Sequence, residues 1–194
     1  MVELQRRRRD SGPREREPLI PAAGVLILGI DPGSLHTGWA IVETKGGSCR
    51  LLDSGRFSLP PDQPLSRRLG DLSHELDALL ARWTPEVAAI ESAFHGRNSK
   101  SLIVLAQARG AILARCGSRR LEVQEYSPAE VKIAVAGNGR ADKAQVARMV
   151  ELLLSLEPGG RSADQTDAMA VAVCFAKRYR IDRLRVSSGD RKAL

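Results

Sequence analysis

Two short runs of apolar residues each end directly in one acidic side chain, and they constrain the fold more than any other feature. Residues 25–30 (Val-Leu-Ile-Leu-Gly-Ile) precede Asp31, and residues 87–90 (Val-Ala-Ala-Ile) precede Glu91. Neither run alternates polar with apolar residues, which is the pattern of strands covered on both faces in an α/β sheet. The chain therefore needs helices on both sides of a sheet.

The spacing of apolar and turn residues predicts the remaining elements. In chain order, we expect strands at 25–30, 37–44 and 49–58, a helix at 65–83, a strand at 87–90, a helix at 99–116 stopped by Gly117, a strand at 121–126, a helix from 128, a long helix from after 139 to about 156, and a last helix from 162 to about 178. Three successive strands followed by alternating helices and strands predict a mixed five-stranded sheet of the α/β class. Two of the helices carry capping-box sequences, Ser127 with Glu130 and Ser162 with Gln165.

Positive charge is distributed unevenly along the chain. The formal net charge is +7, and residues 97–148 carry ten basic side chains against four acidic ones. Residues 1–18 and 177–194 are also basic, whereas the stretch from 19 to 176 is neutral as a whole. A neutral domain with one basic segment and basic ends is typical of a protein that binds a polyanion. A solvated surface with two loose basic tails explains the charge equally well.

The same composition predicts one domain and a reducing compartment. We expect a disordered basic extension at 1–20, one folded domain at 21–178 and a basic tail at 179–194. Residues 1–20 are not expected to be a signal peptide, because acids and prolines interrupt the apolar stretch that a signal peptide needs. The three cysteines show neither disulfide nor zinc spacing, which favours the cytoplasm. The longest apolar run is far shorter than the roughly 20 residues of a membrane span.

Four acidic residues occupy positions where functional groups collect. Asp31 and Glu91 each follow a buried strand, and Asp164 and Asp167 lie three residues apart at the start of the last helix, so they share one helix face. Each acid alone is more often an ordinary surface or first-turn residue. Together they offer oxygen ligands that suit Mg²⁺ or Mn²⁺ rather than zinc. Two such ions about 3.5–4 Å apart promote phosphodiester cleavage, so acids in a polyanion-binding protein indicate a nuclease.

The sequence around these acids resembles the RuvC family of bacterial Holliday-junction resolvases. The matching motifs, in order, are Leu28-Gly-Ile-Asp31-Pro-Gly-Ser-Leu-His-Thr37-Gly-Trp-Ala-Ile-Val, Ala89-Ile-Glu91-Ser-Ala-Phe94 with Asn98, Leu105-Ala-Gln-Ala-Arg-Gly110, Glu125-Tyr-Ser-Pro-Ala-Glu-Val-Lys132, Gly137-Asn-Gly-Arg-Ala-Asp-Lys143 with Gln145-Val146, and Ala163-Asp164-Gln-Thr-Asp167-Ala-Met-Ala. The resemblance covers residues 25–176, and the two ends of the chain lie outside it.

The resemblance implies a ribonuclease-H-like fold and a homodimer that resolves four-way DNA junctions by paired, symmetrical nicks during recombination and repair. It places the catalytic, metal-binding acids at Asp31, Glu91, Asp164 and Asp167, with two Mg²⁺ ions per site and Mn²⁺ as a substitute. Some members carry histidine where this chain has Asp164. Family members also act with a junction-binding and branch-migration complex.

The resemblance further implies DNA contacts at Phe94, Arg97, Asn98, Lys132 and Lys143. An aromatic side chain at Phe94 could stack on junction bases or separate them, although most phenylalanines belong to a core. Lys132 and Lys143 would contact phosphates, which supplies affinity without sequence information.

Two other functions and one packing question stay open at this point. An actin-like or sugar-kinase ATPase also has an acid and a glycine after its first strand, although 194 residues leave no room for the duplicated domain of those enzymes. A junction-binding protein without catalysis is the other alternative. The small residues Ala106, Gly110 and Ala114 permit close packing of their helix, either on the sheet or across a dimer interface.

Overall fold

The protein forms one five-stranded sheet with helices on both faces. The computed structural model describes residues 24–92 and 99–187. The elements are β1 (Val25–Asp31), β2 (His36–Lys45), β3 (Ser48–Ser58), α1 (Leu65–Trp83), β4 (Val87–Glu91), α2 (Ser99–Ser118), β5 (Glu122–Tyr126), α3 (Pro128–Ala136), α4 (Lys143–Leu153) and α5 (Ala163–Ser187). This element order is the predicted one.

The sheet has the order β3-β2-β1-β4-β5. β1, β2 and β3 form an antiparallel meander, whereas β4 runs parallel to β1 and β5 runs parallel to β4. The prediction of a mixed five-stranded sheet is therefore confirmed. Because β1 and β4 are parallel neighbours, their carboxyl ends meet at the same edge of the sheet.

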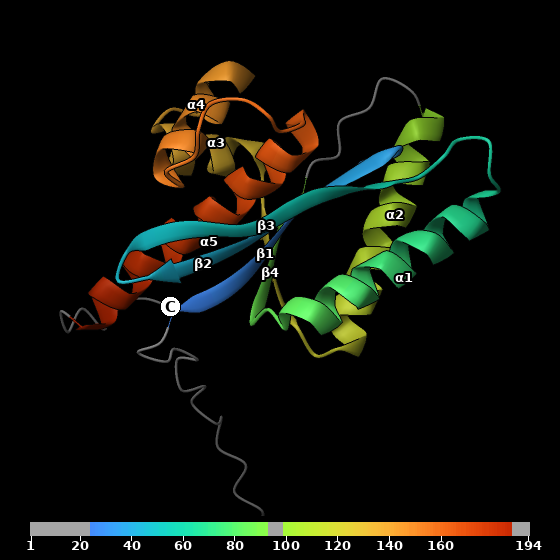
Figure 1. Ribbon diagram of the computed structural model, residues 1–194, viewed down its shortest axis with the longest axis horizontal. Helices are drawn as coiled ribbons and strands as arrows, with labels where there is room; N and C mark the ends of the chain where they lie inside the picture. The colour runs from blue at the N-terminus through green and yellow to red at the C-terminus, as the bar shows by residue number, and fades with distance from the viewer. Residues whose placement is uncertain (1–23, 93–98, 188–194) are drawn as a thin grey trace, which may run out of the picture.

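Two separate apolar cores lie on the two faces of the sheet (Figure 1). On one face, Leu28, Ile30 and Ile90 pack with residues of α1 and α2. On the other face, Ile27 and Ala89 pack with residues of α3, α4 and α5. Burial on both faces explains why the β1 and β4 sequences are wholly apolar.

Glycines allow α5 to lie directly on β1 and β2. A Cβ atom on Gly29 would lie 2.2 Å from the Ala168 carbonyl oxygen, and one on Gly38 would lie 1.9 Å from the Asp164 carbonyl oxygen. Both distances are far inside van der Waals contact, and in both cases the obstacle is helix backbone rather than a movable side chain. The first two turns of α5 therefore touch the sheet backbone because these two positions lack side chains.

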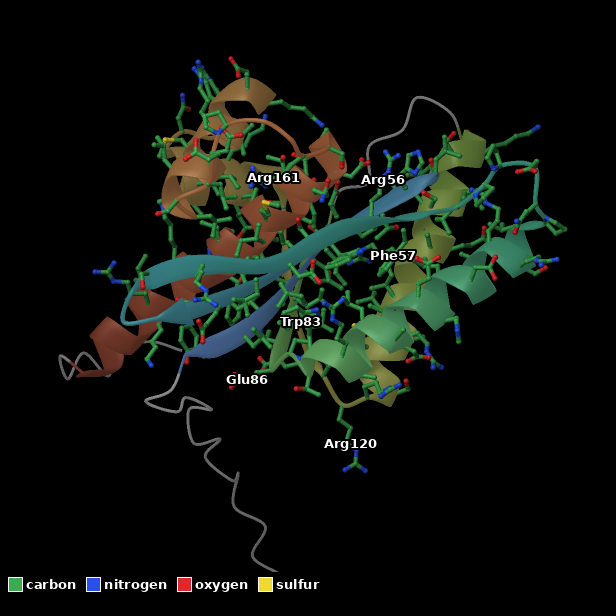
Figure 2. The ribbon with its side chains drawn as sticks, viewed as in Figure 1. Arg56, Phe57, Trp83, Glu86, Arg120 and Arg161 are labelled. Carbon is green, nitrogen blue, oxygen red and sulfur yellow. The ribbon has the colours of Figure 1, made fainter. Side chains whose placement is uncertain are left out.

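Three helix ends differ from the predicted ones. α2 passes through Gly117 and ends at Ser118, because the left-handed backbone turn falls at Arg120 (φ 55°) instead. Figure 2 shows the Arg120 side chain extending away from the molecule at this turn. α4 ends before the left-handed Ser155 (φ 53°) rather than at residue 156.

α5 continues to Ser187, past the predicted end near Arg178, because no glycine or proline interrupts the chain before Gly189. The helix therefore enters the segment predicted as a basic tail. Within the described residues, no helix combines the length and apolarity that a membrane span requires. The predicted extension at 1–20 and the chain from 188 onward lie outside the described residues.

Both predicted capping boxes are confirmed. Ser127 and Glu130 exchange hydrogen bonds at the start of α3, and Ser162 and Gln165 do so before α5, with N···O distances of 3.0 and 3.3 Å in the second pair. A third box, formed by Asp142 and Gln145, begins α4 and was not predicted. These bonds satisfy free N–H groups of the first helical turns and so fix where α4 and α5 begin.

We expect Gly29→Ala and Gly38→Ala each to destabilise the fold by at least about 1–3 kcal/mol, because the added methyl group meets helix backbone. Gly70→Ala is the matched control, since Gly70 is an exposed residue of α1 with no atom within 4 Å of its Cβ position. That control should be neutral or stabilise by up to about 1 kcal/mol. Urea denaturation measures all three, and equal stability of the Gly38 and Gly70 variants would contradict the close approach.

Candidate active site

The four predicted acids come from three elements that meet at one edge of the sheet. Asp31 ends β1 and Glu91 ends β4, directly after the paired residues Ile30 and Ile90, so the two carboxylates are neighbours on parallel strands. Asp31 also pairs with Gly38 of β2, the other neighbour of β1 in the sheet. Both carboxylates are half-buried, as expected for side chains at a strand end that still face solvent.

The other two acids reach this edge because α5 begins there. Asp164 and Asp167 lie in its first turns, and the Asp164 carbonyl group is the one that fills the space over Gly38. Since Gly38 is the strand partner of Asp31, the start of α5 lies beside the end of β1. The side chains of Asp164 and Asp167 are 32% and 27% exposed, so a ligand in solvent can reach them.

The electrostatics of Asp31 show that the four carboxylates act on one another. Burial, together with weaker repulsion from Glu91, Asp167 and Asp164, raises the pKa of Asp31 to about 8. The positive charge of Lys143 acts in the opposite direction. At neutral pH the Asp31 carboxyl group therefore keeps its proton, because burial and the neighbouring negative charges both disfavour the ionised form.

Two basic side chains contact the aspartates of α5. The Lys143 ammonium group donates to Asp167 Oδ2 at 3.2 Å, and Asp167 is the main cause of a raised pKa at Lys143. Arg56 Nη1 of β3 lies 3.8 Å from Asp164 Oδ2. Among the residues that the structure describes, no three acidic, histidine or cysteine side chains are already arranged to hold a metal ion. In this arrangement Lys143 and Arg56 are the counter-ions of Asp167 and Asp164.

The donor set nevertheless fits a hard divalent cation. All four acids offer carboxylate oxygens, the ligands that Mg²⁺ and Mn²⁺ prefer. Asp31 is held protonated largely by burial and by its acidic neighbours, and a divalent positive charge among these groups would favour the ionised form. A site that can bind such an ion and is open to solvent can promote hydrolysis of a phosphodiester.

The loop after Asp31 is anchored by a buried arginine that the sequence analysis missed. Arg68 of α1 is 7% exposed, and its Nη2 donates to the Ser34 carbonyl oxygen at 2.6 Å. Gly33 completes the turn, since its N–H points at Thr37 Oγ1 (3.5 Å) and a Cβ there would lie 1.9 Å from the His36 carbonyl oxygen. The backbone on the carboxyl side of Asp31 is therefore held in place by α1.

A signal for Arg68 existed in the sequence. It lies three residues after Leu65 and four before Leu72, which are members of the apolar stripe of α1, so its side chain had to face the core. A charged residue on such a stripe needs a hydrogen-bond partner inside the protein. The partner is a backbone carbonyl far along the chain, which no residue pattern reveals.

The predicted DNA-binding residues fall into two groups. Lys132 is half-buried on α3, and Lys143 is exposed at the start of α4, where it contacts the acid cluster. Phe94, Arg97 and Asn98 lie outside the described residues. Of the two that the structure describes, Lys143 is the one that contacts an acid of the cluster.

The raised pKa of Asp31 predicts a pH-dependent stability of the metal-free protein. The folded state holds the proton up to about pH 8, whereas an unfolded aspartate loses it near 3.8, so folding stability decreases as pH rises through this interval. Asp31→Asn removes that titration. In EDTA we expect its melting temperature to exceed that of the wild type by about 2–4 °C or more at pH 8, with a smaller difference at pH 5.

Asp62→Asn, at an exposed residue of the loop before α1, controls for the loss of one acidic side chain. Its melting profile against pH should run parallel to that of the wild type. Parallel profiles for Asp31→Asn and wild type would contradict the electrostatic coupling.

Comparison with known proteins agrees with the family resemblance found in the sequence. Residues 27–175 match the family model described as crossover junction endodeoxyribonuclease RuvC. A curated protein of that name from Anaeromyxobacter dehalogenans is 44% identical over 154 residues, which cover 79% of this chain and 82% of that protein. A second one, from Moorella thermoacetica, is 45% identical over 152 residues, covering 78% and 91%.

The fold also matches solved structures. T. thermophilus RuvC in complex with a Holliday junction substrate superposes with a TM-score of 0.77 at 33% identity, over 81% of this chain and 96% of that chain. This likeness identifies the sheet and its helices as the ribonuclease-H-like fold that the sequence resemblance implies.

Proposed function

Because the chain belongs to the RuvC family of crossover junction endodeoxyribonucleases, we propose that it resolves four-way DNA junctions with Asp31, Glu91, Asp164 and Asp167 as catalytic residues. It is a metal-dependent nuclease that hydrolyses phosphodiester bonds. The observation that supports the site assignment most strongly is geometric: Asp31 and Glu91 end neighbouring parallel strands, and the first turn of α5 lies over Gly38, the strand partner of Asp31. The raised pKa of Asp31, to which the other three acids contribute after burial, agrees with this arrangement. Family membership sets aside the ATPase alternative.

We propose that these four residues hold two Mg²⁺ ions and that Mn²⁺ can replace them. The bound ions would supply stabilisation of the charge that develops on the cleaved phosphate. The protein's own contribution is to hold the ligands rigidly. β1 and β4 fix Asp31 and Glu91, the contact of α5 with Gly38 fixes Asp164 and Asp167, and Arg68 anchors the loop after Asp31.

Lys143 has a second role in this proposal. Its ammonium group contacts Asp167 in the free protein and lies on an exposed side chain, so it can turn to a DNA phosphate. Lys132 contributes a second phosphate contact from α3. Phe94, Arg97 and Asn98 complete the DNA-binding set through their match to the family motif, with Phe94 acting on junction bases.

We infer that the active protein is a homodimer that associates through α2. Ala106, Gly110 and Ala114 do not face the sheet, since all three are exposed and no atom lies within 4 Å of a Cβ placed on Gly110. Ile103 is 58% exposed next to them. This uncharged strip, which we call the α2 face, suits a second copy of the chain. Two opposed strands of a two-fold junction then meet two related sites.

The remaining assignments follow the family resemblance. We propose that the protein acts with a junction-binding and branch-migration complex in the bacterial cytoplasm, where chromosomal DNA lies. We also propose that residues 21–178 form the nuclease domain and that the basic ends of the chain add affinity for DNA that decreases with salt.

Asp31→Asn, Glu91→Gln, Asp164→Asn and Asp167→Asn should each reduce junction nicking by at least about 100-fold, because each removes a metal-ligand charge. Junction binding without metal should be equal or tighter, since each change also removes repulsion of the DNA. A plasmid-borne cruciform with Mg²⁺ measures nicking, and a gel shift in EDTA measures binding. Robust cleavage by the Asp31 variant would refute the site.

Gly110→Glu should convert the dimer to a monomer and reduce paired nicking at least about 10-fold, because it places a carboxylate in the apolar α2 face. Leu152→Glu is the control, as Leu152 is 72% exposed on α4, away from that face. Sedimentation velocity reports the oligomeric state. On a cruciform plasmid, paired nicks give linear product and single nicks give open circles. Paired nicking by a monomer would overturn the inference.

A further inference from the structure

Arg56 is a basic side chain at the acid cluster that none of the family motifs in this chain contains. On β3 it pairs with Gly38 of β2, which in turn pairs with Asp31 of β1. Arg56 and Asp31 therefore lie in one row across the sheet, with only a glycine between them. Because directly paired residues project to the same face, both side chains lie on the face that α5 covers.

The neighbouring residue fixes this orientation. Phe57 is buried in the core under α1 and α2 and stacks on Trp39 with ring centroids 5.9 Å apart. Figure 2 shows Arg56 and Phe57 leaving β3 on opposite sides. The packing of Phe57 therefore sets the face of β3 from which the Arg56 side chain projects toward Asp164.

The ion pair of Arg56 is weak enough to be exchanged. Its nitrogen lies 3.8 Å from Asp164 Oδ2, beyond hydrogen-bond distance, and the two side chains are 47% and 32% exposed. Exposed pairs of this kind contribute little to stability, because solvent screens them. Arg161, which is also labelled in Figure 2, is bound more firmly than Arg56. Its Nη1 donates to the carbonyl oxygens of Glu157 and Gly159, both at 3.0 Å.

We propose that Arg56 binds a backbone phosphate of the DNA strand at the active site and exchanges the Asp164 carboxylate for that phosphate when the junction binds. Guanidinium and phosphate groups form paired, charge-assisted hydrogen bonds that are stronger than the long contact with Asp164. The exchange also leaves the Asp164 oxygens available for a metal ion. This inference rests on the proposed junction-cutting function and adds a DNA contact on β3 to the one that Lys143 makes from α4.

The test measures the affinity for an immobile four-way junction in EDTA by fluorescence anisotropy at several salt concentrations. We expect Arg56→Ala to weaken binding about 3–10-fold and to reduce the slope of log K against log salt by about 0.9, the value for one phosphate contact. Arg56→Lys should restore most of the slope. Arg50→Ala, at an exposed arginine at the other end of β3, should change affinity less than about twofold.

A double-variant comparison tests the exchange itself. Asp164→Asn should tighten binding both by removing repulsion of the DNA and by releasing Arg56, so the gain should be clearly smaller in the Arg56→Ala background, where only the reduced repulsion remains. Asp167→Asn releases Lys143 instead, so its gain should persist in that background. Equal gains from Asp164→Asn with and without Arg56 would overturn the exchange.

Further outcomes separate this inference from the proposed function. A wild-type protein that neither binds nor cuts junctions with Mg²⁺ would refute the proposed function. If the wild type cuts but Arg56→Ala keeps its affinity and salt slope, only the Arg56 contact is refuted. Arg56→Gln provides the same readings should the alanine variant fail to fold, because it keeps a long polar side chain on β3.

Discussion

The site depends on the contact between the backbone of α5 and the backbone of the sheet. Helices normally rest on a sheet through a layer of side chains, which keeps the backbones apart. Here Gly29 and Gly38 remove that layer under the first turns of α5. The close contact brings residues 164 and 167 to residues 31 and 91, although more than 70 residues separate the two pairs along the chain. Neither β1 nor α5 alone carries a complete acid set.

Bringing four carboxylates together costs free energy, and the protein offsets that cost with protons and basic side chains. Asp31 keeps a proton, Lys143 contacts Asp167, and Arg56 contacts Asp164. The two basic side chains are exposed, so the compensation is reversible. In the proposed complex, Lys143 and Arg56 leave the aspartates and bind DNA phosphates, and a divalent cation replaces them as the counter-ion of the carboxylates.

The sequence predicts elements whose cause is local and misses those whose cause is distant. Apolar runs, the stripe of α1 and two capping boxes identify the sheet, the helices and the positions of the four acids, because each pattern spans only a few residues. The role of Gly38 depends on where α5 crosses β2, and that of Arg56 depends on strand register. Arg68 stands in the apolar stripe, yet its carbonyl partner is 34 residues away. These contacts join residues that are far apart in the sequence, so no local residue pattern predicts them.

The position of α5 at the end of the fold has a consequence for synthesis. A nascent chain that has left the ribosome only as far as β5 possesses Asp31 and Glu91 but neither aspartate of α5. It also lacks residues 168–174, all buried, which cover one face of β1 and β2. The uncovered face exposes apolar surface, so such a fragment is unstable. With the proposed assignment of the four acids, a nascent chain therefore cannot cut DNA until α5 has docked on the sheet.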